Sequence, residues 1–433
     1  MKLRSLEDIV NADLCLGCGI CQAIAGDNQV KIELDSEGFF RPKVLQDTSN
    51  SWDLIKQVCP GILVQHQINS TDRSWDPLWG PIIDLKAGYA TDETIRWQAS
   101  SGGAISALLC YLLESESADY VLQIGASLEK PLDNKIYLSR SREDILKCAG
   151  SRYAPAAPLT QIRTLLQQNV GRVVFVGKPC DVAALRAFLK FHPELTSKIT
   201  CLISFFCAGT PSIHATEDVI QAMGANKSKV VNFRYRGNGW PGQAMVVTSD
   251  GESYQMGYDD SWGKILGRQL QFRCKICPDG VGELADITCA DGWYLKEGSP
   301  DFTEKPGRSL IFSRTELGRK IVAGAIESGY LASEPYNLSE VELIQPYQAK
   351  RRRLVASRLL ALLIAQSPSP KYVGFHLIRN ALRISMKDNW GSFTGMLHRL
   401  EHRPHRRSGL IFKVLKTLSY LRHTFIRRFF PIL

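Results

Sequence analysis

The sequence predicts an α/β protein in which a mixed sheet forms the main domain, after a cysteine-rich module and before a basic helical extension. Three observations carry this prediction. Apolar, strand-like runs alternate with helical patterns between residues 84 and 247, as in layered α/β domains. Cysteines are grouped on both sides of residue 84, and Lys and Arg are concentrated from Lys350 onward.

We expect a module at residues 1–80 that is irregular apart from turns, a main domain at 81–345, and an extension at 346–433. The expected strands are Asp84–Ala90, Tyr120–Ala126, Lys135–Ser139, Arg172–Val176 and Thr200–Phe206. The expected helices are Ala104–Glu114, Leu159–Gln168, Val182–Lys190, His214–Met223 and Glu316–Ser328. Residues 232–291 predict loops and short strands. The Ser-Pro-Ser-Pro linker at 367–370 is expected to separate the basic tail from the body.

Composition narrows the class of protein. With 433 residues, 44% hydrophobic and 22% charged, the chain has a globular balance, which excludes disordered, collagen-like and small disulfide-scaffold proteins. No run reaches the roughly 18 apolar residues of a membrane-spanning helix, and no signal peptide is recognisable at the N-terminus. The sequence therefore predicts a cytoplasmic protein. Its 12 cysteines would be reduced there, which favours metal or redox chemistry over disulfides.

The net positive charge of the chain belongs to its C-terminal extension. From Lys350 to the end there are 18 Lys and Arg, opposed only by Asp388 and Glu401. The segment Ile411–Arg422 has helical apolar spacing with basic residues between, and Arg427–Phe430 follows it. This pattern predicts docking on an anionic membrane surface, and so a peripheral location, or on a partner subunit. A solvated appendage is the alternative. No nucleic-acid-binding fold is recognisable, so no nucleic-acid partner is expected.

The first cysteine motif is typical of a ferredoxin-type 4Fe-4S cluster. Its thiols are Cys15, Cys18 and Cys21 in C-x2-C-x2-C spacing, with Cys59, which precedes a proline, as the fourth. Gly17 and Gly19 allow the positive φ angles that such a loop needs. A zinc site usually has two C-x2-C pairs instead. Cys59 lies far from the triplet in sequence, so the fold itself must close this site.

A second group is less specific. Cys274 and Cys277 form a C-x2-C pair, while Cys180 and Cys207 each follow a predicted strand. Strand C-terminal ends converge on the ligand crevice of an open α/β sheet, so these four thiols could enclose a second cubane. Free cysteines are also common as small buried hydrophobes, and spacing alone leaves the two interpretations equal.

Several segments between residues 85 and 330 together match the order of motifs in one known family. They are Ser100-Ser101-Gly102-Gly103, Ala149–Tyr153, Lys178-Pro179-Cys180, Phe206-Cys207, Cys274–Cys277, Glu283–Asp286, Asp291-Gly292-Trp293 and Arg308–Thr315. In these segments the sequence resembles the beta subunits of coenzyme F420-reducing hydrogenase and the related formate dehydrogenases and 7-hydroxymethyl chlorophyll a reductase.

The resemblance implies one FAD beside a 4Fe-4S cluster that is held at the positions of Cys180, Cys207, Cys274 and Cys277. With the N-terminal motif, this makes two 4Fe-4S clusters and a flavin. Cys289 departs from the family, in which a small residue is commoner. It is therefore either a bystander or a rival ligand of the second cluster.

The expected flavin site begins with Ser100, Ser101, Gly102 and Gly103, just before an apolar helix whose free N–H groups could bind the FAD pyrophosphate. A simple Ser N-cap would look the same. Lys178 is the expected catalytic residue, because its ammonium could stabilise the reduced ring near N1 and O2. No G-x-G-x-x-G fingerprint is present, which argues against a Rossmann-type nicotinamide site.

Two further segments are candidates for the cofactor's surroundings. Ser151, Arg152 and Tyr153 could supply a cation and an aromatic face, although a surface loop would have similar residues. Asn238 lies in segment 232–242, which has two cations, three aromatic residues and three glycines and could clamp an anionic or planar substrate. The alternative for that segment is a structural hairpin with a cation–π contact.

These features predict an iron–sulfur flavoprotein oxidoreductase. Electrons would pass from a ferredoxin-like carrier through the two clusters to FAD, and then to a small organic substrate, or in reverse from a reduced deazaflavin. One rival is an electron-transfer subunit of a larger complex with no substrate of its own, and another is a zinc scaffold. The sequence leaves the substrate, the direction of electron flow and the formation of a homo-oligomer open.

Overall fold

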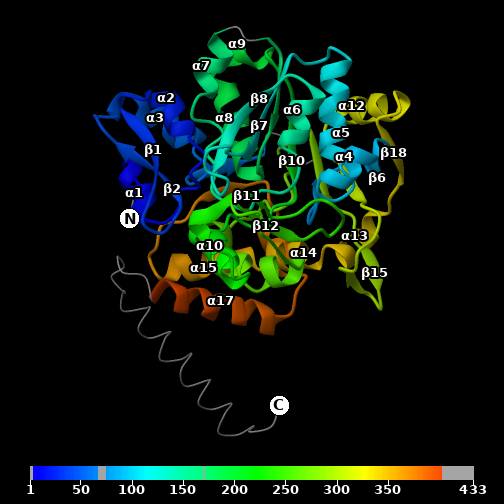
Figure 1. The fold of residues 1–433 in the computed structure, drawn as a ribbon. Helices are drawn as coiled ribbons and strands as arrows, with labels where there is room; N and C mark the ends of the chain where they lie inside the picture. The colour runs from blue at the N-terminus through cyan, green and yellow to red at the C-terminus, as the bar shows by residue number, and fades with distance from the viewer. Residues whose placement is uncertain (1–2, 67–74, 169–170, 402–433) are drawn as a thin grey trace, which may run out of the picture.

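The protein is built around one mixed sheet of eight strands, in the order β18-β6-β17-β14-β10-β9-β7-β8 (Figure 1). The structure is a computed structural model that describes residues 3–66, 75–168 and 171–401. The strands are β6 (Asp84–Ala90), β7 (Tyr120–Ala126), β8 (Asn134–Ser139), β9 (Val173–Val176), β10 (Ile199–Phe205), β14 (Ile287–Asp291), β17 (Ser309–Ser313) and β18 (Leu331–Pro335).

The four central strands of this sheet are parallel, and the strands outside them are antiparallel to their neighbours. β7, β9, β10 and β14 run in one direction, whereas β8, β17, β6 and β18 join by antiparallel pairing. Because β9 and β10 are adjacent and parallel, the residues that follow them emerge at the same edge of the sheet. Cys180 and Cys207 follow these two strands.

Alternate side chains of the central strands pack into separate cores on the two faces of the sheet. In β9, Val173 and Phe175 join a core with α8 (Pro179–Phe191), while Val174 packs with α5 (Ala104–Glu114) on the other face. Strands buried on both faces have continuous apolar sequences, which makes them easy to predict. The α8 face also carries α7 (Ile162–Gln167) and α9 (Pro193–Thr196), and the α5 face carries α4 (Glu93–Gln98), α6 (Arg142–Lys147) and α12 (Glu316–Glu327).

The N-terminal module has more regular structure than its sequence predicts. Its elements are α1 (Leu6–Asn11), α2 (Ile20–Ala25), β1 (Val30–Leu34), β2 (Phe40–Val44), α3 (Ser49–Val58) and β3 (Leu63–Gln65). The expectation of an irregular module is therefore wrong. Helices of six residues, such as α1 and α2, are too short to show a clear apolar period, which is why the sequence did not indicate them. Ser5 caps α1 by accepting a hydrogen bond from the Asp8 N–H.

Smaller elements extend the main domain. A three-stranded antiparallel sheet of β11 (Val230–Arg234), β12 (Ala244–Thr248) and β13 (Ser253–Met256) packs with α10 (Ile213–Ala222), as the predicted loops and short strands suggested. The remaining short elements are β4 (Trp75–Asp76), β5 (Gly80–Pro81), α11 (Phe272–Lys275), β15 (Tyr294–Lys296) and β16 (Ser299–Asp301), with single helical turns at Lys227–Lys229, Asp259–Gly263 and Leu266–Arg268.

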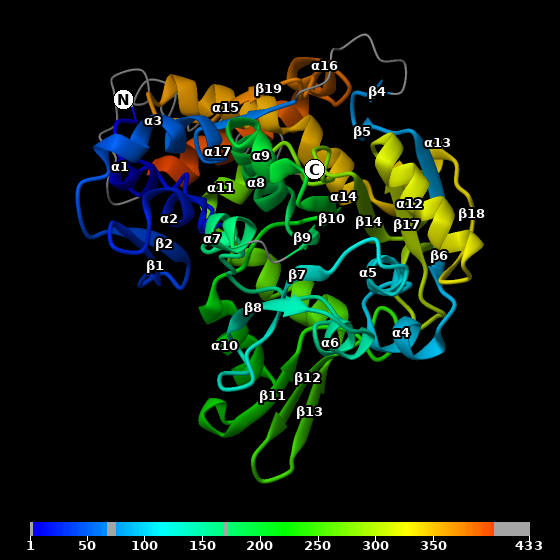
Figure 2. The ribbon, with the colours of Figure 1, turned by 90° about the horizontal axis from the view of Figure 1, so that it is seen from above.

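The described part of the C-terminal extension packs against the body. Its elements are α13 (Leu338–Ile344), α14 (Pro346–Arg353), α15 (Val355–Ile364), β19 (Lys371–Val373), α16 (Leu377–Ala381) and α17 (Met386–Glu401). β19 pairs in parallel with β3 of the N-terminal module, and Met396 and Leu400 of α17 join the same core as Leu6 and Ile9. Figure 2 shows α15, β19 and α16 along one edge of the molecule.

This packing corrects the expectation of a separate tail after the Ser-Pro-Ser-Pro linker. Residues 371–401 lie against the body because β19 pairs with β3 and α17 buries apolar side chains in the same core as α1. The basic amphipathic segment Ile411–Arg422 and the residues Arg427–Phe430 lie outside the described residues. None of the described helices is both long and apolar enough to cross a membrane.

Candidate functional site

The first cysteine motif encloses a cavity in the N-terminal module. Cys15, Cys18 and Cys21 come from the loop before α2 and its first turn, and Cys59 follows the last residue of α3. All four line one cavity together with Gly17, Gly19, Ile20, Ile32, Pro42 and Pro60. The fold therefore brings Cys59 to the triplet, and we call these four residues the N-terminal cysteine group.

Two glycines shape the loop of this group. Gly17 and Gly19 have φ angles of 70° and 90°, where side chains are rarely accommodated. A Cβ atom at Gly17 would also stand 2.6 Å from the carbonyl oxygen of Phe40. The N–H of Gly17 donates to the Cys15 Sγ over 3.3 Å, so the tight loop aims a backbone donor at a thiol sulfur. Burial, together with Cys15, raises the pKa of Cys59 to about 12.

The second cysteine group assembles from three distant segments at one edge of the sheet. Cys180 lies in the first turn of α8, Cys207 follows β10, Cys274 belongs to α11, and Cys277 follows α11. Burial, with the neighbouring Cys274 and Cys277, raises the pKa of Cys207 to about 12, which reflects how closely these thiols lie. The Thr210 N–H donates to the Cys274 Sγ over 3.4 Å. We call Cys180, Cys207, Cys274 and Cys277 the sheet-edge cysteine group.

Cys289 is not part of this arrangement. It lies within β14, and its side chain packs with Ile203 and Ile311 in the core on the α5 face. Burial alone raises the pKa of its thiol to about 12. Across the described part of the chain, no group of three or more His, Cys, Asp and Glu side chains is arranged to hold one metal ion.

Arg273 lies between the two cysteine groups. Its side chain is buried, and Nη2 donates to the carbonyl oxygen of Pro60 over 2.8 Å, next to Cys59. Although burial opposes the charge, Tyr372, Cys277 and Cys180 raise the pKa of Arg273. Its Nε and Nη1 atoms have no hydrogen-bond partner within the described residues. The Arg273 guanidinium thus lies against both cysteine groups, and two of its nitrogen atoms have no hydrogen-bond partner among the described residues.

Asp181 and Lys178 form a second link. The Lys178 Nζ lies 2.7 Å from the Asp181 Oδ2, at the start of α8. Burial and the charge of Asp181 raise the pKa of Cys18, so this carboxylate lies near the N-terminal cysteine group. Burial would lower the pKa of Lys178, but Asp181 and Cys180 raise it above its ordinary value. Lys178 is therefore a protonated cation beside Cys180.

The Ser-Ser-Gly-Gly segment before α5 packs tightly on the sheet. The Ser100 Oγ lies 2.8 Å from the Ser151 Oγ, so the structure brings these two predicted residues together. Ser101 donates to the Arg308 carbonyl over 2.7 Å, and the Gly102 N–H donates to the Ser309 Oγ. The Gly102 donor is thus already used.

Gly102 and Gly103 are fixed by packing and backbone conformation. A Cβ atom at Gly102 would stand 2.7 Å from the carbonyl oxygen of Gly88 in β6. Gly103 precedes α5 with a φ of 73°. Both glycines therefore have structural roles, whatever binds at the start of the helix.

Arg152, Tyr153 and Asn238 have largely structural contacts. Arg152 Nε donates to the Asn134 Oδ1 over 2.7 Å, and its other nitrogens donate to the backbone carbonyls of Pro131, Leu132, Asp133 and Phe233. This guanidinium holds a loop through these contacts. The Tyr153 ring lies 4.6 Å from the Trp262 ring. Asn238 has a φ of 55° within the 232–242 segment.

Arg236, one of the two cations of segment 232–242, has a partner that the sequence did not indicate. Arg236 is buried and forms a bidentate pair with Asp291, at 3.0 and 2.9 Å. The Trp240 Nε1 donates to the same carboxylate over 3.0 Å. Arg236 is therefore neutralised within the protein. Nothing near Arg236 in the sequence indicates that Asp291 is its partner, because the two residues lie in distant segments.

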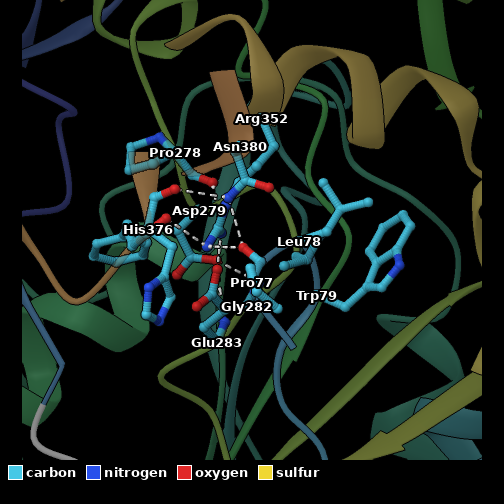
Figure 3. A network of polar contacts seen from close by, with 12 residues as sticks. Pro77, Leu78, Trp79, Pro278, Asp279, Gly282, Glu283, Arg352, His376 and Asn380 are labelled. Atoms are coloured by element: carbon cyan, nitrogen blue, oxygen red, sulfur yellow. Dashed lines mark hydrogen bonds and ion pairs between the residues drawn. The ribbon is translucent and has the colours of Figure 1, made fainter. Parts of the chain in front are cut away.

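A buried polar network ties the end of the N-terminal module to the C-terminal extension (Figure 3). Glu283 lies 2.8 Å from the His66 Nε2 and forms an ion pair with Arg352. Burial, with Arg352 and Arg314, lowers the pKa of His66 to about 3, so its ring is neutral. Asn380 donates to the Pro77 carbonyl over 2.6 Å. This network fixes the extension beside the sheet-edge cysteine group.

Comparisons with known proteins place the chain in a family. Models of the N-terminal and C-terminal parts of the coenzyme F420 hydrogenase/dehydrogenase beta subunit match residues 85–163 and 170–338. A coenzyme F420-dependent sulfite reductase of Methanocaldococcus jannaschii is 25% identical over 80% of this chain, which spans 50% of that protein. A coenzyme F420 hydrogenase subunit beta of Methanosarcina barkeri is 24% identical over 66% of this chain and 91% of the relative.

A solved structure shows the same fold. One chain of the F420-reducing NiFe hydrogenase complex from Methanosarcina barkeri, studied as a xenon derivative, aligns with a TM-score of 0.53 and 22% identity. The alignment covers 68% of this chain and 98% of that chain. The relatives are oxidoreductases or their subunits, and the resemblance predicted from sequence is confirmed. The chain belongs to the coenzyme F420 hydrogenase/dehydrogenase beta subunit family.

Proposed function

We propose that this protein is an iron–sulfur flavoprotein oxidoreductase with two 4Fe-4S clusters and one FAD. It would pass electrons between a ferredoxin-like carrier and a small organic substrate or a deazaflavin coenzyme. The observation that carries the proposal is the juxtaposition of the two cysteine groups across Arg273 and Asp181. Two groups of four thiols, each assembled by the fold and joined by one buried cation, suit a short electron path.

The N-terminal cysteine group fits a cubane in its ligand set and in its loop. The four thiols around a cubane each bind a different iron, so they surround a cavity instead of converging on one point. Cys15, Cys18, Cys21 and Cys59 line such a cavity. The Gly17 N–H directed at the Cys15 sulfur is the kind of hydrogen bond that stabilises a bound thiolate.

The sheet-edge cysteine group fits an anionic cluster because buried cations lie beside it, and one of them has unpaired donors. Arg273 is buried with Nε and Nη1 unpaired, and a buried charge without a partner is costly. A cluster bound by four thiolates carries net negative charge and would offset that cost. Lys178, protonated beside Cys180, adds a second cation.

For the flavin we infer a site along the start of α5. Ser100 and Ser151 lie together there, and an eleven-residue helix offers its N-terminal N–H groups to an anion such as the FAD pyrophosphate. When bound, the clusters would supply one-electron transfer and the flavin would couple single electrons to hydride transfer. Lys178 would hold its proton and stabilise negative charge between the sheet-edge cysteine group and the ring. Tyr153 would line the site, and Arg152 would hold its loop.

A second candidate function is that of an electron-transfer subunit in a larger complex. The structural neighbour is part of a hydrogenase complex, and several relatives are named as beta subunits. In this case the chain would bind a partner subunit and have no substrate of its own. The basic segment beyond residue 401 would suit docking to such a partner or to an anionic membrane surface.

Anaerobic purification followed by iron, sulfide and flavin assays tests the main proposal. We expect about eight irons, as two clusters of four, and one FAD per chain. The purified chain should reduce or oxidise a deazaflavin coenzyme when a ferredoxin or a viologen dye serves as redox partner. Full cofactor content without such activity, together with co-purification of another subunit, would favour the second candidate. A preparation that contains zinc and no iron would contradict both.

A further inference from the structure

The loop that carries Cys274 and Cys277 is held by the C-terminal extension through its own backbone. Four of its carbonyl groups accept hydrogen bonds from that extension. The donors and acceptors are Arg351 to Cys274, Arg358 to Lys275, Tyr372 to Ile276, and Arg352 to Pro278, over 2.7, 2.7, 2.9 and 3.1 Å. Every one of these donors lies outside residues 85–163 and 170–338, where the family models match.

Arg351 joins the two halves of the sheet-edge cysteine group. Its Nη1 donates to the Cys207 carbonyl over 2.7 Å, and its Nη2 donates to the Cys274 carbonyl over the same distance. The rigid, planar guanidinium therefore fixes the end of β10 relative to α11. Lysine has one compact ammonium and could not span both carbonyls with the same geometry.

The charge of Arg351 is buried beside three of the four thiols. The side chain is only 7% exposed. Cys277, Cys274 and Cys207 are among the groups whose charges interact with it. A fixed cation in a weakly screened site favours the more negative of two redox states. Charge and hydrogen bonding around the sulfurs are also what set the potential of an iron–sulfur cluster.

The extension itself is firmly anchored, so this cation is held in place. Arg352, the next residue, forms an ion pair with the buried Glu283 and donates to the Phe375 carbonyl over 3.0 Å. The pairing of β19 with β3 fixes the segment beyond α15. Arg353, by contrast, pairs with Glu342 at 2.6 Å and is not directed at the cysteines.

We propose that Arg351 is a positioning residue that raises the reduction potential of the sheet-edge cluster and clamps its two ligand-bearing segments. The proposal rests on the proposed function, because it requires a cluster at the sheet-edge cysteine group. It assigns the C-terminal extension a role in the redox site, beyond packing.

The test compares Arg351→Gln and Arg351→Lys with Arg353→Gln in the full-length holoprotein. Arg353→Gln removes the same charge from the same helix, α14, and is the matched control. Iron and FAD are assayed, and the midpoint potential of each cluster is measured by EPR-monitored redox titration. We expect Arg351→Gln to weaken reduction of the sheet-edge cluster about tenfold, which is about 59 mV for one electron. Arg351→Lys should keep the native potential, and Arg353→Gln should match the wild type.

The clamp has its own readout. In Arg351→Lys the bidentate bridge is lost, so a ferrous chelator should remove the irons of the sheet-edge cluster several-fold faster than in Arg353→Gln. The N-terminal cluster should be unaffected in all variants. If Arg351→Gln does not retain its second cluster, the Lys variant still tests the charge: a potential below that of the wild type would overturn the proposal.

Equal potentials in Arg351→Gln and Arg353→Gln would also overturn it. A wild-type protein with iron only at the N-terminal cysteine group would instead contradict the proposed function. The two failures are therefore distinguishable. Equal potentials can be measured only in proteins that contain both clusters, whereas the absence of the sheet-edge cluster is already seen in the wild type.

Discussion

The two cysteine groups are built in opposite ways. Three thiols of the N-terminal group come from one loop of seven residues, and only Cys59 is remote. The sheet-edge group takes its thiols from the first turn of α8, from the segment after β10, and from α11 with the segment that follows it, and it has a clamp from the C-terminal extension. A site made by local chain geometry can be recognised from spacing, whereas one made by topology becomes visible only in the folded chain.

The largest expected effect is the loss of iron when a proposed cluster ligand of either group is substituted. Cys18→Ala should remove about half of the iron and abolish the N-terminal cluster, while Cys277→Ala should remove the other half. Cys289→Ala is the control, because that thiol is packed among apolar side chains. Iron assays and EPR spectra measure the outcome. Loss of all iron in Cys18→Ala would show that the two clusters depend on one another for assembly.

The N-terminal loop should be sensitive to a single methyl group. Gly19 has a φ of 90°, and its Cβ would stand 2.6 Å from the Thr160 Cγ2. Gly26 has a φ of 92° with nothing within 4 Å. Gly26→Ala should cost about 1 kcal/mol of unfolding free energy through backbone strain alone, and Gly19→Ala about 3 kcal/mol because overpacking adds to it. Denaturant unfolding measures both, and equal losses would refute the close packing at Thr160.

Arg273 should affect both groups, in contrast to Arg351. Arg273→Met removes a charge that lies near Cys59 as well as near Cys277 and Cys180. We expect both clusters to become harder to reduce, each by about tenfold in the redox equilibrium, while Arg273→Lys preserves most of the potential. Redox titration of each EPR signal is the measurement. A change in the reduction potential of only one cluster would show that Arg273 does not act on both groups.

The last prediction concerns pH and the network that anchors the clamp, part of which Figure 3 shows. His66 has a pKa of about 3 in the folded protein and about 6.5 when unfolded. The unfolded chain therefore binds more protons between these values, and stability falls as the pH drops from about 6.5 toward 3. The slope from this residue is about 1.4 kcal/mol per pH unit. Urea unfolding of the apo chain at several pH values should show a shallower slope in His66→Gln than in the wild type.

Much of the sheet could be predicted from the sequence because its signals are local. β6, β7 and α5 have the predicted bounds, since buried strands and an apolar helix have strong periodic patterns. The same reasoning missed β17 and β18 on the antiparallel side, and it gave no bounds for β14. It also missed the short helices of the N-terminal module. Elements of five or six residues carry too little pattern to be distinguished from loops.

The sequence indicated both cysteine groups, but it said less about what surrounds them. The sequence indicated the N-terminal group by spacing, and the resemblance indicated the other four cysteines. Arg152 was expected beside the cofactor, but its donors are used by backbone carbonyls. Arg273 and Arg351 were not singled out, because nothing near them in sequence distinguishes them from other cations. Their partners, Pro60 and Cys207, are distant residues that only tertiary packing brings close.

The pairing of β3 with β19 has a consequence for how the protein is made. β3 ends at Gln65 and its partner strand begins at Lys371, so one edge of the N-terminal module stays unpaired until most of the chain has been synthesised. Contacts of such wide sequence separation form late, because a large loop must close before they contribute. On the proposed function, insertion of the N-terminal cluster into its finished site would follow synthesis of the extension, and its thiols would need protection from oxygen until then.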